Sequence, residues 1–87
     1  MNMELIWKNI QRHEGVTFRT VRGIGYTYVV YDGYLLVNDD KKRRITKEDI
    51  HKALMILNPT PGKLGRAGIW GTSYVYGIIT DERIRCG

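Results

Sequence analysis

The sequence predicts an α+β fold in which helices cover one face of a small antiparallel sheet. Three observations predict this class. Apolar residues recur at helical spacing near the N-terminus and after residue 46, an Asp-Gly pair separates two stretches rich in β-branched and aromatic residues, and Gly and Pro interrupt the chain over 59–71. With 87 residues the chain has room for one core. We therefore expect a single small basic domain, 1–87.

The first expected element is an amphipathic helix over 3–13, with polar residues on its outer sides. Asn2 is a suitable N-cap and Gly15 a suitable stop. The helix is expected to dock through Trp7 or through the apolar stripe of Leu5, Ile6 and Ile10.

A three-stranded antiparallel meander is expected next, over 16–22, 26–31 and 34–38, because these stretches suit a half-buried pleated surface. Asp32-Gly33 lies between Tyr31 and Tyr34, which is typical of a two-residue hairpin. A type I′ turn there requires positive φ at both central positions.

A second helix is expected over 47–57. Thr46 is the N-cap, and Asp49 at the third helical position gives a weaker form of the capping box. Its apolar stripe is formed by Ile50, Ala53, Leu54 and Leu57. The sequence Asn58-Pro59 is expected to stop the helix.

A long Gly/Pro loop follows over 59–71, and then a short C-terminal element over 72–80. Apolar spacing favours a helix there, with Ser73 as its N-cap. The alternative is a strand, because the residue types favour one and Gly77 costs about 1 kcal/mol inside a helix.

The charge distribution is uneven. Lys and Arg outnumber Asp and Glu by 14 to 9, which gives a net charge of +5, and no acidic residue occurs between Ile50 and Thr80. Such a distribution attracts phosphate backbones or acidic protein surfaces, and it can also serve solubility alone. The candidate binding residues are the following cations and one Trp: Lys41, Lys42, Arg43, Arg44, Lys63, Arg66, Arg19, Arg22 and Trp70.

No pattern in the sequence indicates catalysis, a cofactor or a metal. Asp32 and Asp40-Lys41-Lys42 superficially resemble a metal-dependent nuclease site, but an extended strand separates the two carboxylates by about 26 Å. His13 and His51 have no second ligand at suitable spacing. The single cysteine, Cys86, excludes an internal disulfide and a zinc site built on cysteines. We expect no enzyme and no small-molecule substrate.

The segment Gly62-Lys63-Leu64-Gly65 resembles the GXXG loop of KH domains, which clamps a nucleic-acid backbone. It departs from that family in having Pro61 before the first glycine and a meander in place of the family's strand order. Independently of the resemblance, backbone amides together with Lys63 and Arg66 could approach a phosphate.

Strand alternation also places tyrosines on the open face of the sheet, beside Arg19 or Arg22. There they could stack on bases or anchor a protein interface. Cross-strand packing that only stabilises the sheet is the alternative.

These features predict a nucleic-acid- or nucleoprotein-binding module that contacts phosphates of DNA or RNA. The alternative is a phage or mobile-element inhibitor or adaptor that binds a host nucleic-acid-processing (defence) enzyme and blocks its channel. The N-terminus lacks the pattern of a signal peptide and no apolar run is long enough to span a membrane, so a cytoplasmic location is expected.

Overall fold

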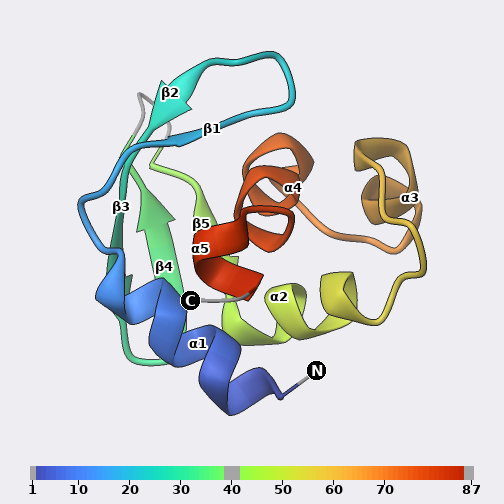
Figure 1. Cartoon of the computed structure of the whole chain (residues 1–87). Helices are drawn as coiled ribbons and strands as arrows, with labels where there is room; N and C mark the ends of the chain where they lie inside the picture. The colour runs from blue at the N-terminus through green and yellow to red at the C-terminus, as the bar shows by residue number, and fades with distance from the viewer. Residues whose placement is uncertain (1, 39–41, 86–87) are drawn as a thin grey trace.

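The computed structural model describes residues 2–38 and 42–85, and it confirms the α+β class (Figure 1). Five helices and five strands occur in the described part of the chain. In order they are α1 (Met3–Arg12), β1 (Phe18–Arg19), β2 (Gly25–Tyr26), β3 (Tyr28–Tyr31), β4 (Tyr34–Val37), β5 (Arg44–Thr46), α2 (Lys47–Leu54), α3 (Pro61–Arg66), α4 (Thr72–Ile79) and α5 (Glu82–Arg85).

A three-stranded antiparallel sheet is present, in the order β3-β4-β5. The hairpin at Asp32-Gly33 is confirmed, because Tyr31 pairs with Tyr34. The expected type I′ turn is wrong: Gly33 has φ +81°, whereas Asp32 is not among the non-glycine residues with positive φ in the described part of the chain. One left-handed residue is enough to close this turn.

The third strand of the sheet is β5, which was not among the expected strands. Ile45 is buried opposite Leu35, while Arg44 faces outward, so Ile45 alone among the three residues of this strand is buried in the core. The expected strand 16–22 pairs only at Phe18–Arg19, with β2, as a separate two-stranded sheet. The expected strand 26–31 is accordingly divided between β2 and β3.

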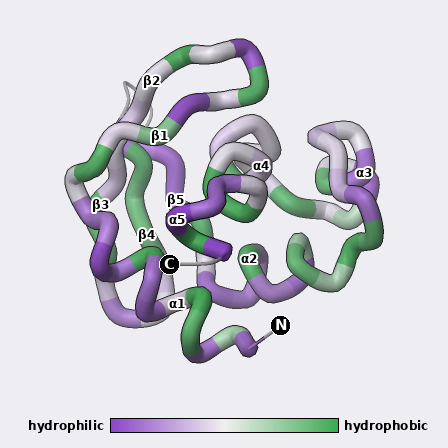
Figure 2. The backbone as a smooth tube through the Cα atoms, in the orientation of Figure 1, coloured by the Kyte–Doolittle hydropathy of each residue, from purple (hydrophilic) through white to green (hydrophobic). Residues whose placement is uncertain are grey.

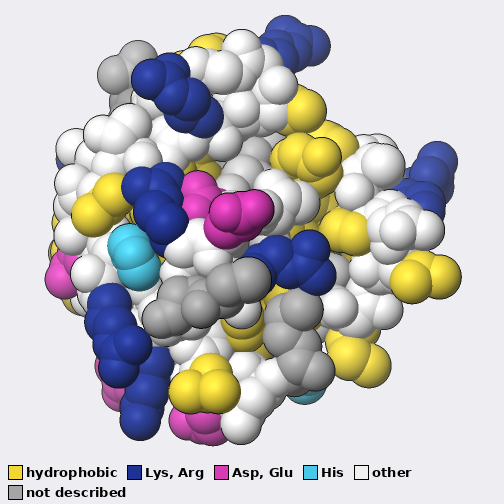
Figure 3. Space-filling view, in the orientation of Figure 1, with side chains coloured by type: hydrophobic (Ala, Val, Ile, Leu, Met, Phe, Trp, Pro, Cys, Tyr) yellow, Lys and Arg dark blue, Asp and Glu magenta, His cyan; other side chains and the backbone are white. Residues whose placement is uncertain are grey.

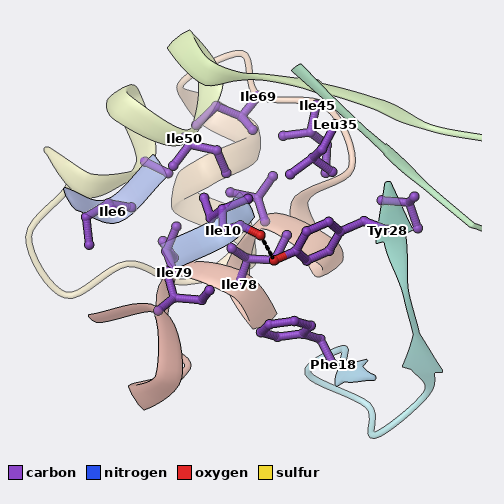
Figure 4. Close-up of a cluster of buried hydrophobic side chains, with 14 of the residues drawn as sticks. Ile6, Ile10, Phe18, Tyr28, Leu35, Ile45, Ile50, Ile69, Ile78 and Ile79 are labelled. Carbon is purple, nitrogen blue, oxygen red and sulfur yellow. Dashed lines mark hydrogen bonds between the residues drawn. The ribbon is translucent and has the colours of Figure 1, made fainter. Parts of the chain in front are cut away.

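The hydrophobic core lies between the inner face of the sheet and the helices. Tyr28, Leu35 and Ile45 point inward and are fully buried. Figure 4 shows the Tyr28 ring directed toward α1, where its O–H donates a hydrogen bond of 2.6 Å to the Ile10 carbonyl oxygen. Each fully buried apolar side chain of this size contributes about 1.5–3 kcal/mol. In Figure 2 the hydrophobic β4 lies beside the hydrophilic chain that leads into β5.

Helix α1 begins as expected, because the Asn2 side chain accepts a hydrogen bond from the Glu4 backbone N–H at 2.8 Å. Trp7 is buried together with Ile6 and Ile10, but Leu5 is 59% exposed and does not belong to the docking stripe. Asn9 is also buried, and its side-chain amide donates to the Ile84 carbonyl oxygen at 2.8 Å, which ties α1 to α5.

Helix α2 has the predicted capping box, in which Thr46 and Asp49 bond each other's backbone N–H groups. The helix ends at Leu54 and not at residue 57, and Leu57 is 83% exposed. After Leu54 the chain tightens, since the N–H groups of Met55 and Ile56 donate to carbonyl oxygens only three residues back, both at 3.2 Å. Farther on, Asn58 adopts a positive φ of 49°, and the Lys63 ammonium group binds the carbonyl oxygens of Leu57 and Asn58 at 3.2 and 3.1 Å.

The predicted irregular loop over 59–71 contains helix α3. Thr60 caps this helix by accepting from the Lys63 backbone N–H at 3.2 Å, and Pro61 occupies the first turn, where its missing N–H costs nothing. The segment Gly62–Gly65 is therefore helical, and the GXXG loop expected from the KH resemblance does not form. The element over 72–80 is the helix α4 and not a strand, but its N-cap is Gly71 and not Ser73.

None of the helices in the described part of the chain combines the length and the apolar character that crossing a bilayer requires.

Candidate nucleic-acid interface

Two of the predicted binding arginines line one hollow, which we call the arginine pocket. Its volume is about 370 Å³. It is lined by Thr20, Arg22, Ile24, Arg43, Gly71, Thr72, Ser73 and Tyr74. None of these lining residues is acidic, so the pocket presents cations, hydroxyl groups and backbone to any ligand.

Arg22 is positioned by the tight turn between β1 and β2. The Thr20 N–H donates to the Ile24 carbonyl oxygen at 2.9 Å, and the Gly23 N–H donates back to the Thr20 carbonyl oxygen at 2.9 Å. Gly23 adopts a φ of +85°, which a glycine permits without strain. The guanidinium of Arg19 braces the turn by donating to the Gly23 carbonyl oxygen at 3.1 Å. The backbone at Arg22 is therefore held at the tip of a short, cross-linked hairpin.

Arg43 reaches the pocket from the other sheet. Its carbonyl oxygen accepts from the Val37 N–H at 2.8 Å, which fixes the backbone just before β5. Its Cδ atom lies 3.7 Å from the point where a Cβ on Gly71 would stand. The aliphatic part of Arg43 thus packs beside Gly71 at the start of α4.

The N-terminus of α4 forms one wall of the pocket. Gly71 is left-handed (φ 65°) and supplies no side-chain cap. Its carbonyl oxygen accepts from the N–H groups of Tyr74 and Val75, both at 3.0 Å, which begins the helix. The N–H groups at the start of an α-helix lack intrahelical acceptors and carry partial positive charge. The hydroxyl groups of Thr72 and Ser73 stand in the same wall.

The outer face of the β3-β4-β5 sheet carries a second group of interacting side chains, which we call the stacking row. The rings of Tyr31 and Tyr34 are stacked, with centroids 5.2 Å apart and planes 14° from parallel. The Cζ atom of Arg44 lies 4.0 Å from the centroid of the Tyr34 ring. The expected open-face tyrosines are thus present, but the arginine beside them is Arg44 and not Arg19 or Arg22.

Lys42 adjoins the same face. With Val29, Tyr31 and Leu36, as well as Val37 and Asn38, it lines a small hollow of about 110 Å³. Lys42 directly precedes Arg43 in the chain, but this hollow and the arginine pocket share no lining residue.

The remaining predicted site residues are distributed differently. Arg19 lines a neighbouring hollow of about 510 Å³ that shares Thr20 with the arginine pocket. Lys63 and Arg66 lie on α3 and line neither hollow, and the Lys63 ammonium group binds the carbonyl oxygens of Leu57 and Asn58 in the segment after α2. Trp70 is 79% exposed and directly precedes Gly71. Lys41 lies outside the described residues, as does Asp40 of the nuclease-like pattern.

Arg22 and Arg43 form no salt bridge with a carboxylate in the described part of the chain. The two salt bridges found there join Lys47 to Glu4 at 3.6 Å and Arg83 to Asp81 at 2.8 Å. On the face of the molecule that Figure 3 shows, the Lys and Arg side chains are spread over several separate regions. On this face, therefore, the cations form no single continuous patch.

The groups with displaced pKa values take part in packing. Hydrogen bonds from the Arg83 guanidinium lower the pKa of Asp81, and that guanidinium also donates to the Thr17 carbonyl oxygen at 3.1 Å and covers the Phe18 ring at 4.4 Å. Burial raises the pKa of Tyr26, whose O–H donates to the Tyr74 carbonyl oxygen at 2.8 Å. Within 2–38 and 42–85, no three His, Cys, Asp or Glu side chains gather closely enough to hold a metal ion.

Sequence reasoning missed the contribution of Gly71, Thr72 and Ser73, because the segment before them was expected to be irregular. A signal was present in the glycine before a helical apolar pattern, since glycine is an acceptable N-cap residue. Comparison of the chain with protein-family models, with curated proteins and with solved structures gave no match.

Proposed function

We propose that this protein binds nucleic acid through contacts to phosphate groups, centred on the arginine pocket. The observation that carries the proposal is the convergence of Arg22 and Arg43, from segments remote along the chain, on one hollow lined by no acidic residue. Guanidinium groups match the geometry and charge of phosphate, and the start of a helix favours an anion.

The surroundings of the pocket support a polyanion over an isolated anion. Lys42 lies beside Arg43 in the chain and lines the hollow on the sheet face, and Arg44 lies on the outer face of β5. A phosphate chain that occupies the pocket can therefore meet further cations along the segment 42–44. The net charge of +5 favours the approach of such a chain over long range.

The test is a titration of fluorescently labelled DNA and RNA oligonucleotides, followed by anisotropy at salt concentrations between about 50 and 200 mM. With four cations in contact with phosphates, log K should fall against log salt with a slope of about −3 to −4. The double variant Arg22→Ala/Arg43→Ala should weaken binding and reduce the magnitude of the slope by about two.

The matched control is Lys8→Ala/Arg12→Ala, which removes the same charge from the exposed side of α1. Figure 1 places α1 at the bottom of the molecule, whereas the β1-β2 hairpin lies at the top. If the two double variants lose affinity equally, net charge alone governs binding and the pocket has no special role. If the wild-type protein binds neither DNA nor RNA at low salt, the proposal fails, and capture of a nucleic-acid-processing enzyme becomes the function to examine.

A further inference from the structure

We propose that the outer face of the β3-β4-β5 sheet binds unpaired bases, so that the nucleic acid recognised is single-stranded. This inference rests on the proposed function, because it assigns the class of nucleic acid from a surface that carries Lys42 and Arg44, the chain neighbours of Arg43.

The stacking row ends in an accessible aromatic ring. Tyr34 is in contact with Tyr31 on one strand and with Arg44 on the other, and it is only partly exposed. Tyr31 stands at the end of the row and is 46% exposed. A base that stacks on Tyr31 would extend an existing stack of planar groups. Stacking of this kind accepts any base, because every base has an aromatic face.

The row is held in place before any ligand binds. Tyr31 and Tyr34 flank a two-residue hairpin turn and are paired across it. The free edge of β3 is closed by the N-terminal segment, since the Val30 N–H donates to the Glu14 carboxylate at 2.8 Å and the Gly15 N–H donates to the Tyr28 carbonyl oxygen at 3.1 Å. Such an edge is not open to a partner protein that adds a strand to the sheet.

The cations of the face favour an anionic ligand. No residue of β3, β4 or β5 is acidic, while Arg44 lies on the face and Lys42 lines the hollow beside Tyr31. Two carboxylates border the face: Asp32 in the hairpin turn, and Glu14, which binds the Val30 N–H at the β3 edge. A ligand that carries negative charge together with flat apolar groups fits the cations and the tyrosines. A single strand offers both at once, whereas a duplex buries the faces of its bases within its own stack.

The experiment compares labelled oligo-dT and oligo-rU of about 12 nucleotides, which carry unpaired bases, with a DNA duplex of the same length. The variants are Tyr31→Leu, which removes the ring and keeps an apolar side chain, and Tyr31→Phe, which keeps the ring. Melting curves check that both variants are folded. We expect the single strands to bind more tightly than the duplex, Tyr31→Leu to weaken their binding by about 5- to 150-fold, and Tyr31→Phe to leave it within about twofold.

A second readout needs no variant. In NMR spectra of the wild-type protein, the ring protons of Tyr31 should move upfield when a single strand is added and should remain unchanged with the duplex.

Failure of this inference is distinguishable from failure of the proposed function. If the duplex binds as tightly as the single strands, or if Tyr31→Leu has no effect while Arg22→Ala/Arg43→Ala weakens binding, the sheet face is not a base-binding surface and the phosphate contacts stand. If Trp70→Ala reproduces the loss and Tyr31→Leu does not, stacking occurs at Trp70 and the inference is wrong. If no oligonucleotide binds, both proposals are overturned.

Discussion

Gly77 offers the most direct test of how the two-stranded sheet is attached to the helices. It lies in the interior of α4, where glycine is unfavourable by about 0.8–1.0 kcal/mol relative to alanine. A Cβ added at this position would collide with the Arg19 carbonyl oxygen and would stand 2.9 Å from the Tyr26 hydroxyl oxygen. The glycine therefore allows the backbone of β1 to lie directly against α4.

The substitution Gly77→Ala sets these effects against each other. Helix propensity favours alanine by about 1 kcal/mol. Overpacking against a backbone atom costs about 1–3 kcal/mol, because no side-chain rotation relieves it. The Tyr26 hydroxyl binds the Tyr74 carbonyl oxygen at 2.8 Å, and its displacement costs about a further 0.5–1.5 kcal/mol. The net result is a loss of about 0.5–3.5 kcal/mol in the free energy of unfolding.

Urea unfolding followed by far-UV circular dichroism measures this difference. The matched control is Gly65→Ala in α3, where the nearest atom to the added Cβ is the Thr72 Cγ2 at 3.9 Å, an ordinary contact. Gly65→Ala should be stabilising by about 0.4–1 kcal/mol. A Gly77→Ala protein as stable as the wild type, or more stable, would refute the close approach of β1 to α4.

Three further predictions concern the core and the helix caps. Arg83 lowers the pKa of Asp81 in the folded protein. The stabilisation by this carboxylate is therefore present above the unfolded-state pKa near 3.9 and is lost as the pH falls through the lower folded-state pKa. In acid unfolding curves, the stability difference between wild type and Asp81→Asn should shrink as the pH falls. Burial raises the pKa of Tyr28, so the wild type should lose stability as the pH rises above about 10, and Tyr28→Phe should lose less there. At neutral pH, Tyr28→Phe should be less stable than the wild type by about 0.5–1.5 kcal/mol, because it lacks the hydrogen bond to the Ile10 carbonyl oxygen. Thr46→Ala, which removes the cap of α2, should cost about 0.5–2 kcal/mol in urea unfolding at neutral pH.

Elements with strong local signals were predictable from the sequence. Helix α1 and the capping box of α2 follow from side chains that bond backbone groups a few residues away, and the Asp32-Gly33 hairpin follows from a glycine at the one position that needs a positive φ. Because these interactions join residues close together in the chain, they can be predicted from the sequence without knowledge of the tertiary structure.

Elements that depend on distant contacts were not predictable. Strand β5 forms because Ile45 fills a space opposite Leu35, and its charged neighbours concealed this role. Helix α3 forms in a segment rich in glycine because Leu64 is buried in the core, and the local cap by Thr60 was concealed by the surrounding glycines and prolines.

The candidate site was predictable in the same partial way. The cations of 42–44 and Arg22 stood out by charge, but the sequence could not show that Arg22 and Arg43 meet at the start of α4 while Lys63 binds the segment after α2. Such convergence is a property of tertiary packing.

The most direct test of nucleic-acid binding at the arginine pocket maps the interface itself. In a ¹H–¹⁵N NMR titration with an oligonucleotide of unpaired bases, we expect chemical-shift changes concentrated at the β1-β2 turn, the start of α4 and the segment 42–44, and extending to Tyr31. Changes centred on α1 or α3, with the arginine pocket unaffected, would contradict it.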